Sequence, residues 1–91
     1  MVHNPEDAMK LTVMSREYCS LCHKMIEALK PYQRRHGFEL EIVDVDSDPV
    51  LEATYNELVP VLLDGEHRIC HWHLDEDALQ AWLAGQTPAA G

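Results

Sequence analysis

Hydrophobic residues recur along the chain with two different spacings, which predict strands and helices in turn. Residues 11–14 form a short apolar run that is typical of a buried strand. From Ser20 to about His36 the apolar residues fall three and four apart, as on one face of a helix. These residues are Cys22, Met25, Ile26, Leu29 and Tyr32. We expect the helix to kink at Pro31, whose ring removes a backbone donor, and to stop at Gly37.

The middle of the chain predicts a second strand and a second helix. Residues 38–46 begin with strict alternation of apolar and polar positions, the period of a strand. Ser47 and Asp48 then supply capping side chains, and Pro49 suits the first position of a helix. The helical spacing that follows predicts a buried face formed by Val50, Leu51, Thr54, Tyr55 and Leu58.

The last third predicts a hairpin and a final helix. Asp64 and Gly65 separate the apolar residues 61–63 from residues 67–70, and an Asp-Gly pair readily adopts the positive φ angles of a tight hairpin turn. Asp75 is placed to cap a helix that extends to Gly85.

The element order is therefore strand, helix, strand, helix, strand, strand, helix (βαβαββα). With 91 residues, the chain is long enough for one hydrophobic core but not for two. We predict an α/β domain over residues 10–85, a flexible segment over residues 1–9 and a disordered tail over residues 86–91.

Charge narrows the range of partners. The chain carries 16 acidic and 7 basic side chains, a formal charge of -9, which repels nucleic acid and anionic lipid surfaces. No export signal or membrane-spanning stretch is visible, so we expect a cytoplasmic protein without a membrane partner. In a reducing cytosol a close pair among the three cysteines is more often catalytic or metal-binding than structural.

The segment Cys19-Ser20-Leu21-Cys22-His23 fits three chemistries: haem attachment, half of a zinc site, or a redox dithiol. Haem is disfavoured because no methionine follows Met25 to serve as an axial ligand. Zinc is a real alternative if the fold brings further side chains close to the pair to complete a tetrahedral set. These side chains are Cys70, His71 and His73.

The dithiol interpretation agrees best with the helix pattern. Cys22 belongs to the buried stripe, whereas Cys19 lies off it at the helix start, where unpaired backbone N–H groups stabilise a thiolate. Cys19 is thus the candidate nucleophile and Cys22 the resolving thiol. We expect Arg16 to favour the thiolate electrostatically, although Glu17 opposes it.

Here the chain resembles the glutaredoxin-like branch of the thioredoxin-fold family. The resemblance covers roughly residues 10–84 through the element order, the Cys19–Cys22 motif and Val59-Pro60-Val61 before the hairpin. It implies a thioredoxin-like fold, with a four-stranded mixed sheet flanked by three helices. It also implies a cis bond before Pro60, which would lie beside the cysteine pair and hold a thiol substrate. We expect the substrate groove to be formed by Tyr18, Val59, Pro60 and Trp72, the last of which is placed in a loop.

Two departures from that family affect the substrate. Ser20-Leu21 replaces the Pro-Tyr pair common between glutaredoxin cysteines, and residues 70–73 (Cys-His-Trp-His) lack the Gly-Gly pair expected to approach glutathione. We therefore expect glutathione to fit poorly. The topology also predicts Cys70 at the same edge as the motif, as an auxiliary thiol.

The sequence thus predicts a monomeric thiol-disulfide oxidoreductase without cofactor or bound metal. Its partner would be a protein or small-molecule disulfide. Two alternatives stay open: a metal-binding or iron-sulfur carrier module, and a redox-inactive interaction domain.

Overall fold

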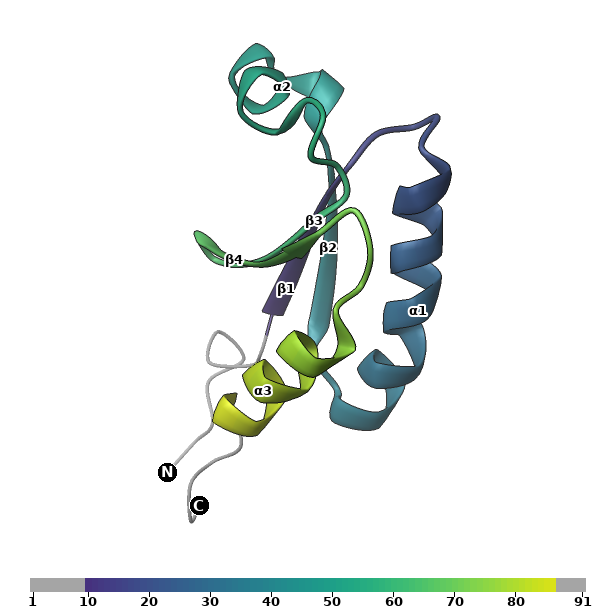
Figure 1. The fold of residues 1–91 in the computed structure, drawn as a ribbon, viewed down its shortest axis with the longest axis vertical. Helices are drawn as coiled ribbons and strands as arrows, with labels where there is room; N and C mark the ends of the chain where they lie inside the picture. Colours follow the sequence, from purple (N-terminus) through teal and green to yellow (C-terminus); the bar gives the residue numbers. More distant parts are fainter. Residues whose placement is uncertain (1–9, 87–91) are drawn as a thin grey trace.

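The computed structural model describes residues 10–86, which form a four-stranded sheet and three α-helices (Figure 1). The elements in chain order are β1 (Lys10–Ser15), α1 (Ser20–His36), β2 (Glu39–Asp44), the short 3-10 helix η2 (Val45–Ser47), α2 (Pro49–Tyr55), β3 (Val61–Asp64), β4 (His67–His71) and α3 (Glu76–Gln86). The predicted order of elements is confirmed. The predicted flexible segment 1–9 lies outside the described residues, as does the predicted tail 86–91 except for Gln86, which belongs to α3.

The sheet has the strand order β2-β1-β3-β4, with β1 and β2 parallel and the other neighbouring strands antiparallel. It is therefore mixed, as predicted. On the inner strand β1, Leu11, Val13 and Ser15 are buried and the residues between them are less so. This alternation follows from side chains pointing to opposite faces of a strand. The strand ends at Ser15, so the cysteine motif follows directly at one end of the sheet.

The main core lies between the sheet and the helices α1 and α3. Its buried members come from both helices, from β1 and β3, and from the residue just before β2. They are Leu11, Val13, Met25, Leu29, Phe38, Leu62, Leu79 and Leu83. Burial of Met25 and Leu29, the two residues of α1 in this core, accounts for most of the stability of α1.

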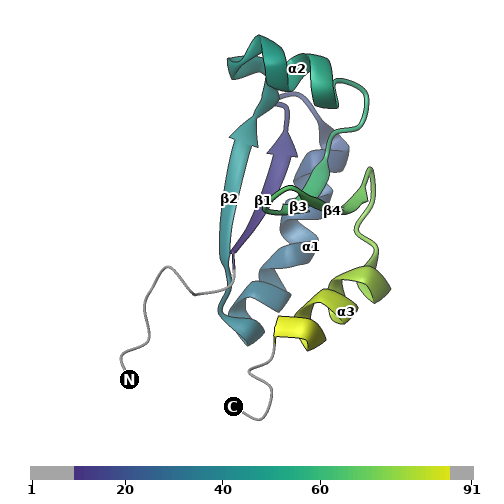
Figure 2. The same ribbon diagram turned by 90° about the vertical axis from the view of Figure 1, so that its left-hand side faces the viewer.

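Helix α2 lies beyond the end of the sheet at which β1 and β2 finish (Figures 1 and 2). None of its side chains is fully buried. Leu51 and Tyr55 nevertheless pack against a second, smaller cluster of buried residues, Cys22, Val45 and Val59, which we call the motif cluster. The fold therefore places α2 against the end of the molecule that carries the cysteine pair.

Three local predictions were wrong in detail. The second strand ends at Asp44 rather than residue 46, because the Asp44 carboxylate accepts a bond from the Asp46 N–H and starts η2. Val50 and Thr54, predicted on a buried face, are exposed, Val50 by 71%, because α2 is short and stands at the end of the sheet. Leu58, predicted on the same face, lies beyond α2, which ends at Tyr55. Gly85 does not end the last helix, which extends to Gln86.

The predicted helix stop at Gly37 and the predicted caps Asp48 and Asp75 are confirmed. The kink at Pro31 stays a prediction, and Ser47 donates to the Asp44 carbonyl instead of capping α2. Helix α1 continues through Pro31 and ends at Gly37, which adopts the left-handed conformation with φ 74° and bonds to the Gln33 carbonyl. Asp48 caps α2 and Asp75 caps α3 through backbone N–H groups. Among the described residues, no helix is long and apolar enough to cross a membrane.

Candidate redox site

Cys19 occupies the N-cap position of α1. Its backbone is extended, with φ -121° and ψ 105°, and its Sγ accepts a hydrogen bond from the Cys22 N–H at 3.1 Å. The pair is joined in a disulfide, with the two Cα atoms 5.2 Å apart. In the reduced protein the same N–H group and the positive end of the helix dipole would stabilise a Cys19 thiolate.

The two sulfurs of the pair differ in exposure. Cys22 is 0% exposed and belongs to the motif cluster with Val45 and Val59, whereas Cys19 is only partly buried and packs at the edge of that cluster. An incoming thiol or disulfide therefore meets Cys19 first. This is the asymmetry that the helical spacing predicts.

The loop before β3 lies in the same cluster. The Val59–Pro60 peptide bond is cis, as predicted. Val59 is 9% exposed and packs in the motif cluster, which places this loop beside the cysteine pair. The Pro60 carbonyl accepts a hydrogen bond from the Trp72 N–H at 2.8 Å, and so ties the end of β4 to this loop.

Trp72 stands in a left-handed backbone conformation, with φ 68°. Its indole N–H donates to the Glu57 carbonyl at 2.8 Å, and the His71 ring contacts it edge-on with ring centroids 4.9 Å apart. Despite these contacts, Trp72 is 47% exposed. The fold thus brings Trp72 next to Pro60, and its role in a substrate groove stays a prediction.

Tyr18, the other aromatic residue predicted at the groove, is 93% exposed directly before Cys19. Its contact with a substrate in the groove stays a prediction.

Arg16 does not act as a free cation beside the motif. Its Nε donates to both carboxylate oxygens of Asp46 at 3.1 Å, and its Nη atoms reach the backbone and side-chain oxygens of Asn56 at 3.4 and 3.2 Å. The expected electrostatic support for the thiolate is therefore largely cancelled. Arg16 instead links the loop between β1 and Cys19 to η2 and to the end of α2.

The hydrogen bonds that Arg16 makes to Asp46 and Asn56 were not predicted from the sequence. Asp46 and Asn56 lie 30 and 40 residues from Arg16 along the chain. No local spacing indicates such a contact, and only the folded topology brings these residues together.

Cys70 lies on β4 opposite Leu62, partly buried against the main core rather than in the motif cluster. Burial raises the pKa of its thiol, and this outweighs a backbone hydrogen bond from Asp75 that lowers it. A raised pKa leaves less thiolate for exchange. The auxiliary role of Cys70 stays a prediction.

The zinc alternative required ligands from among Cys70, His71 and His73 to complete a tetrahedral set with the cysteine pair. Within residues 10–86, no group of three or more His, Cys, Asp or Glu side chains is placed to hold a metal ion. A carrier using Cys19 and Cys22 would therefore need further ligands from another molecule.

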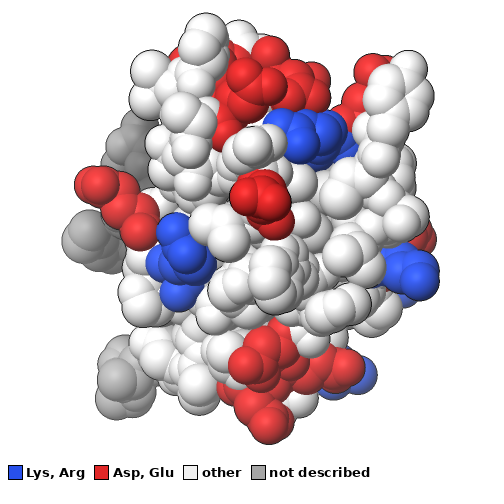
Figure 3. Space-filling view, turned by 45° about the horizontal axis from the view of Figure 1, so that its top comes forward, with Lys and Arg blue, Asp and Glu red and all other residues white. Residues whose placement is uncertain are grey.

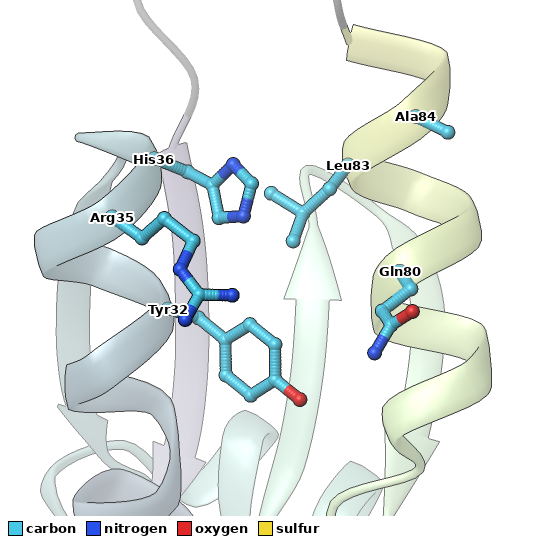
Figure 4. A pocket seen from close by; sticks show the side chains of 6 residues that line it. All are labelled: Tyr32, Arg35, His36, Gln80, Leu83 and Ala84. Atoms are coloured by element: carbon cyan, nitrogen blue, oxygen red, sulfur yellow. The ribbon is translucent and has the colours of Figure 1, made fainter.

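A separate hollow lies between α1 and α3 (Figure 4). It measures about 360 Å³, and its lining residues are Tyr32, Arg35, His36, Gln80, Leu83 and Ala84. Three of these residues belong to the C-terminal half of α1 and three to α3, whereas Cys19 caps the N-terminus of α1. This hollow is therefore not part of the candidate redox site.

Known structures confirm the fold. A protein of Nitrosomonas europaea, solved by solution NMR, is 37% identical with a TM-score of 0.74, covering 89% of this chain and 98% of that one. A crystallised protein of X. campestris is 40% identical with a TM-score of 0.65, covering 82% and 96%. The thioredoxin of Fasciola hepatica shares the fold at 19% identity, with a TM-score of 0.63 and coverage of 90% and 86%.

Sequence relatives point to the same group. An uncharacterized protein of Mycobacterium tuberculosis is 33% identical over 85 residues, 86% of each chain. Residues 10–84 match the model of the glutaredoxin-like domain (DUF836), the same span that carries the cysteine pair, the cis proline and the four strands. The chain therefore belongs to the glutaredoxin-like domain family and has a thioredoxin fold.

Proposed function

We propose that this protein is a thiol-disulfide oxidoreductase in which Cys19 is the nucleophile and Cys22 the resolving thiol. The observation that carries the proposal is the asymmetry of the pair. Cys19 caps α1 at the surface, while Cys22, one turn on, is 0% exposed. This is the arrangement that thiol-disulfide exchange needs, because one sulfur must meet the substrate and the other must wait beside it.

The proposed reaction begins with the reduced pair. The Cys19 thiolate attacks one sulfur of the substrate disulfide, and the other substrate sulfur leaves and takes up a proton. Cys22 then loses its proton and attacks the Cys19 sulfur, which releases the second substrate thiol. Two electrons pass to the substrate, and a dithiol reductant returns them to the Cys19–Cys22 disulfide.

The surrounding residues support binding of an extended substrate. Tyr18 and Trp72 offer exposed aromatic surface, and Val59 and Pro60 border the pair. The proposed substrate is a protein or small-molecule disulfide, and the proposed setting is a monomer in the reducing cytosol.

The first prediction concerns the two cysteines. Cys19→Ser reduces the rate of disulfide reduction to background, because no other described thiol caps the helix. Cys22→Ser keeps the attacking thiol and accumulates a covalent complex with substrate, because the resolving step is lost. Stopped-flow reduction assays and non-reducing gels measure the two outcomes.

Alkylation of the reduced protein tests the same roles without a substrate. Iodoacetamide should modify Cys19 well before Cys22, and equal rates for the two thiols would contradict the assignment. Freshly purified protein that contains stoichiometric zinc or iron would favour the carrier function instead.

A further inference from the structure

Trp72 is held in its unusual backbone conformation by contacts on three sides. Among the described residues it is the only non-glycine residue with a positive φ angle, in a region that L side chains rarely adopt. Its own N–H bonds to the Pro60 carbonyl, its indole N–H bonds to the Glu57 carbonyl, and the His73 N–H bonds across it to the His71 carbonyl, each at 2.8 Å. A residue in such a conformation persists only where its surroundings fix it.

The indole is therefore both fixed and half-exposed. Because its N–H is already bonded within the fold, what the indole can offer a partner is its aromatic face and edge rather than a hydrogen-bond donor. A contact surface that is already ordered binds a partner without a further loss of side-chain entropy. Among common side chains, a lysine or arginine gains an additional attraction to such a face.

The charges near this indole also favour a cation. Figure 3 brings the α2 end of the molecule forward and shows acidic side chains gathered over α2. The segments that carry the motif, the residues packed in the motif cluster and the contacts of Trp72 are residues 16–23, 44–60 and 70–75. Their acidic residues are Glu17, Asp44, Asp46, Asp48, Glu52, Glu57 and Asp75.

Arg16, the one lysine or arginine in those segments, is already bonded to Asp46, and Lys24 and Arg68 lie just outside them. With seven acidic side chains against these three basic ones, the field at the site is negative. Such a field speeds the approach of a basic partner and opposes an anionic one.

We infer that the substrate is a polypeptide disulfide with a lysine or arginine near its cysteine, and that this cation lies on the indole of Trp72. The inference rests on the proposed oxidoreductase function and specifies its substrate class. Glutathione, which is small and carries a net negative charge, is disfavoured by the acidic surroundings. It is also disfavoured by the side chain of Trp72, which lies in the segment where the glutaredoxin-like family has the Gly-Gly pair that approaches glutathione.

Three synthetic peptides test the inference. Each carries one cysteine in a mixed disulfide with the same chromophoric thiol, and they differ only in an Arg, Ala or Glu two residues from that cysteine. The fully reduced protein is mixed with each peptide in a single-turnover experiment. We expect the rate constants to fall in the order Arg, Ala, Glu, with the Arg peptide about two- to fivefold faster than the Ala peptide. Added salt should narrow the spread.

Two variants separate the indole from the charge. Trp72→Gly accepts the positive φ angle and removes the ring, so the preference for Arg over Ala should fall toward one. Glu57→Gln removes a charge but keeps the backbone carbonyl that holds the indole, so it should reduce mainly the salt-dependent part. Glu39→Gln, at the start of β2 and the opposite end of the sheet, is the control with the same change of charge.

The possible results distinguish the inference from the proposed function. Equal rates for the three peptides, or an unchanged preference in a folded Trp72→Gly variant, overturn the inference while leaving the oxidoreductase intact. Reduction of none of the peptides, with the wild type indistinguishable from Cys19→Ser, overturns both.

Discussion

At the scale of single residues, Arg16 shows how a side chain near the motif can have a structural task. A guanidinium next to a cysteine pair suggests a charge that stabilises the thiolate. In the fold its Nε is bonded to both oxygens of Asp46, and the rest of the group reaches Asn56. Arg16 therefore positions the loop before Cys19, and the helix N-terminus is left as the main source of thiolate stabilisation.

Cys70 gives a prediction at the same scale. Burial raises the pKa of this thiol above its ordinary value, so its thiolate fraction at neutral pH is reduced and grows only as the pH becomes alkaline. If Cys70 exchanges with the Cys19–Cys22 disulfide, species that contain Cys70 should therefore accumulate at alkaline pH and be scarce at neutral pH.

Mass spectrometry of the protein after mild oxidation and acid quenching would identify these species, and Cys70→Ser supplies the blank. A disulfide with Cys70 that forms as readily at neutral as at alkaline pH would contradict the expected reactivity. If the same species form in the wild type and in Cys70→Ser at every pH, Cys70 takes no part in exchange and is only a core residue.

At the scale of secondary-structure elements, most of this fold was predictable because each element carries its own local signal. The stripe of α1, the Asp64-Gly65 turn and the caps Asp48 and Asp75 depend on residues close in sequence. The end of β2 and the exposure of Val50 were not predictable in this way. They depend on η2 and on where α2 stands relative to the sheet, which are set by tertiary packing.

One contact between elements yields a pH-dependent prediction. The Tyr32 hydroxyl of α1 donates a hydrogen bond to the Glu76 carboxylate of α3. This bond raises the pKa of the Tyr32 phenol, because the phenolate would lose the donated proton and face a negative charge, and it outweighs an opposing bond from Gln80. The stabilising effect of the bond is present below the usual tyrosine range and is lost as the pH rises through the raised pKa.

The absorbance of phenolate, taken as wild type minus Tyr32→Phe, isolates this group from the other two tyrosines. We expect its midpoint to lie above that of free tyrosine and to fall in Glu76→Gln. Asp77→Asn, one residue further along α3, removes a carboxylate without touching the hydrogen bond and should shift the midpoint less. Equal shifts in the two variants would assign the effect to general charge rather than to the bond.

At the scale of the whole molecule, the candidate site was predictable as a set of residues but not as an arrangement. The spacing of Cys19 and Cys22 already indicates which thiol is buried, and the family resemblance indicates the cis bond before Pro60. The left-handed backbone of Trp72 and its bond to the Glu57 carbonyl have no local signal in the sequence. They arise because the hairpin returns β4 to the loop before β3.

Because the interior is divided into two clusters, we expect that a substitution in the main core changes the free energy of unfolding without changing the reduction potential of the cysteine pair. Leu29 is buried in the main core, which contains neither cysteine of the pair, whereas Val45 packs in the motif cluster with Cys22. The packing around Leu29 should be the same whether the pair is oxidised or reduced. The packing around Val45 must adjust when the Cys22 sulfur is released from Cys19.

Truncation of each side chain tests this separation. Leu29→Ala should lower the free energy of unfolding by about 2–5 kcal/mol in both redox forms and leave the reduction potential unchanged. Val45→Ala removes less apolar volume and should destabilise the protein less, but it should act unequally on the two forms and shift the potential by about 10–30 mV, since 30 mV corresponds to about 1.4 kcal/mol. Urea titrations of both forms and equilibration with a dithiol buffer provide the two readouts. A potential that moves as far in Leu29→Ala as in Val45→Ala would show that the two clusters act as one.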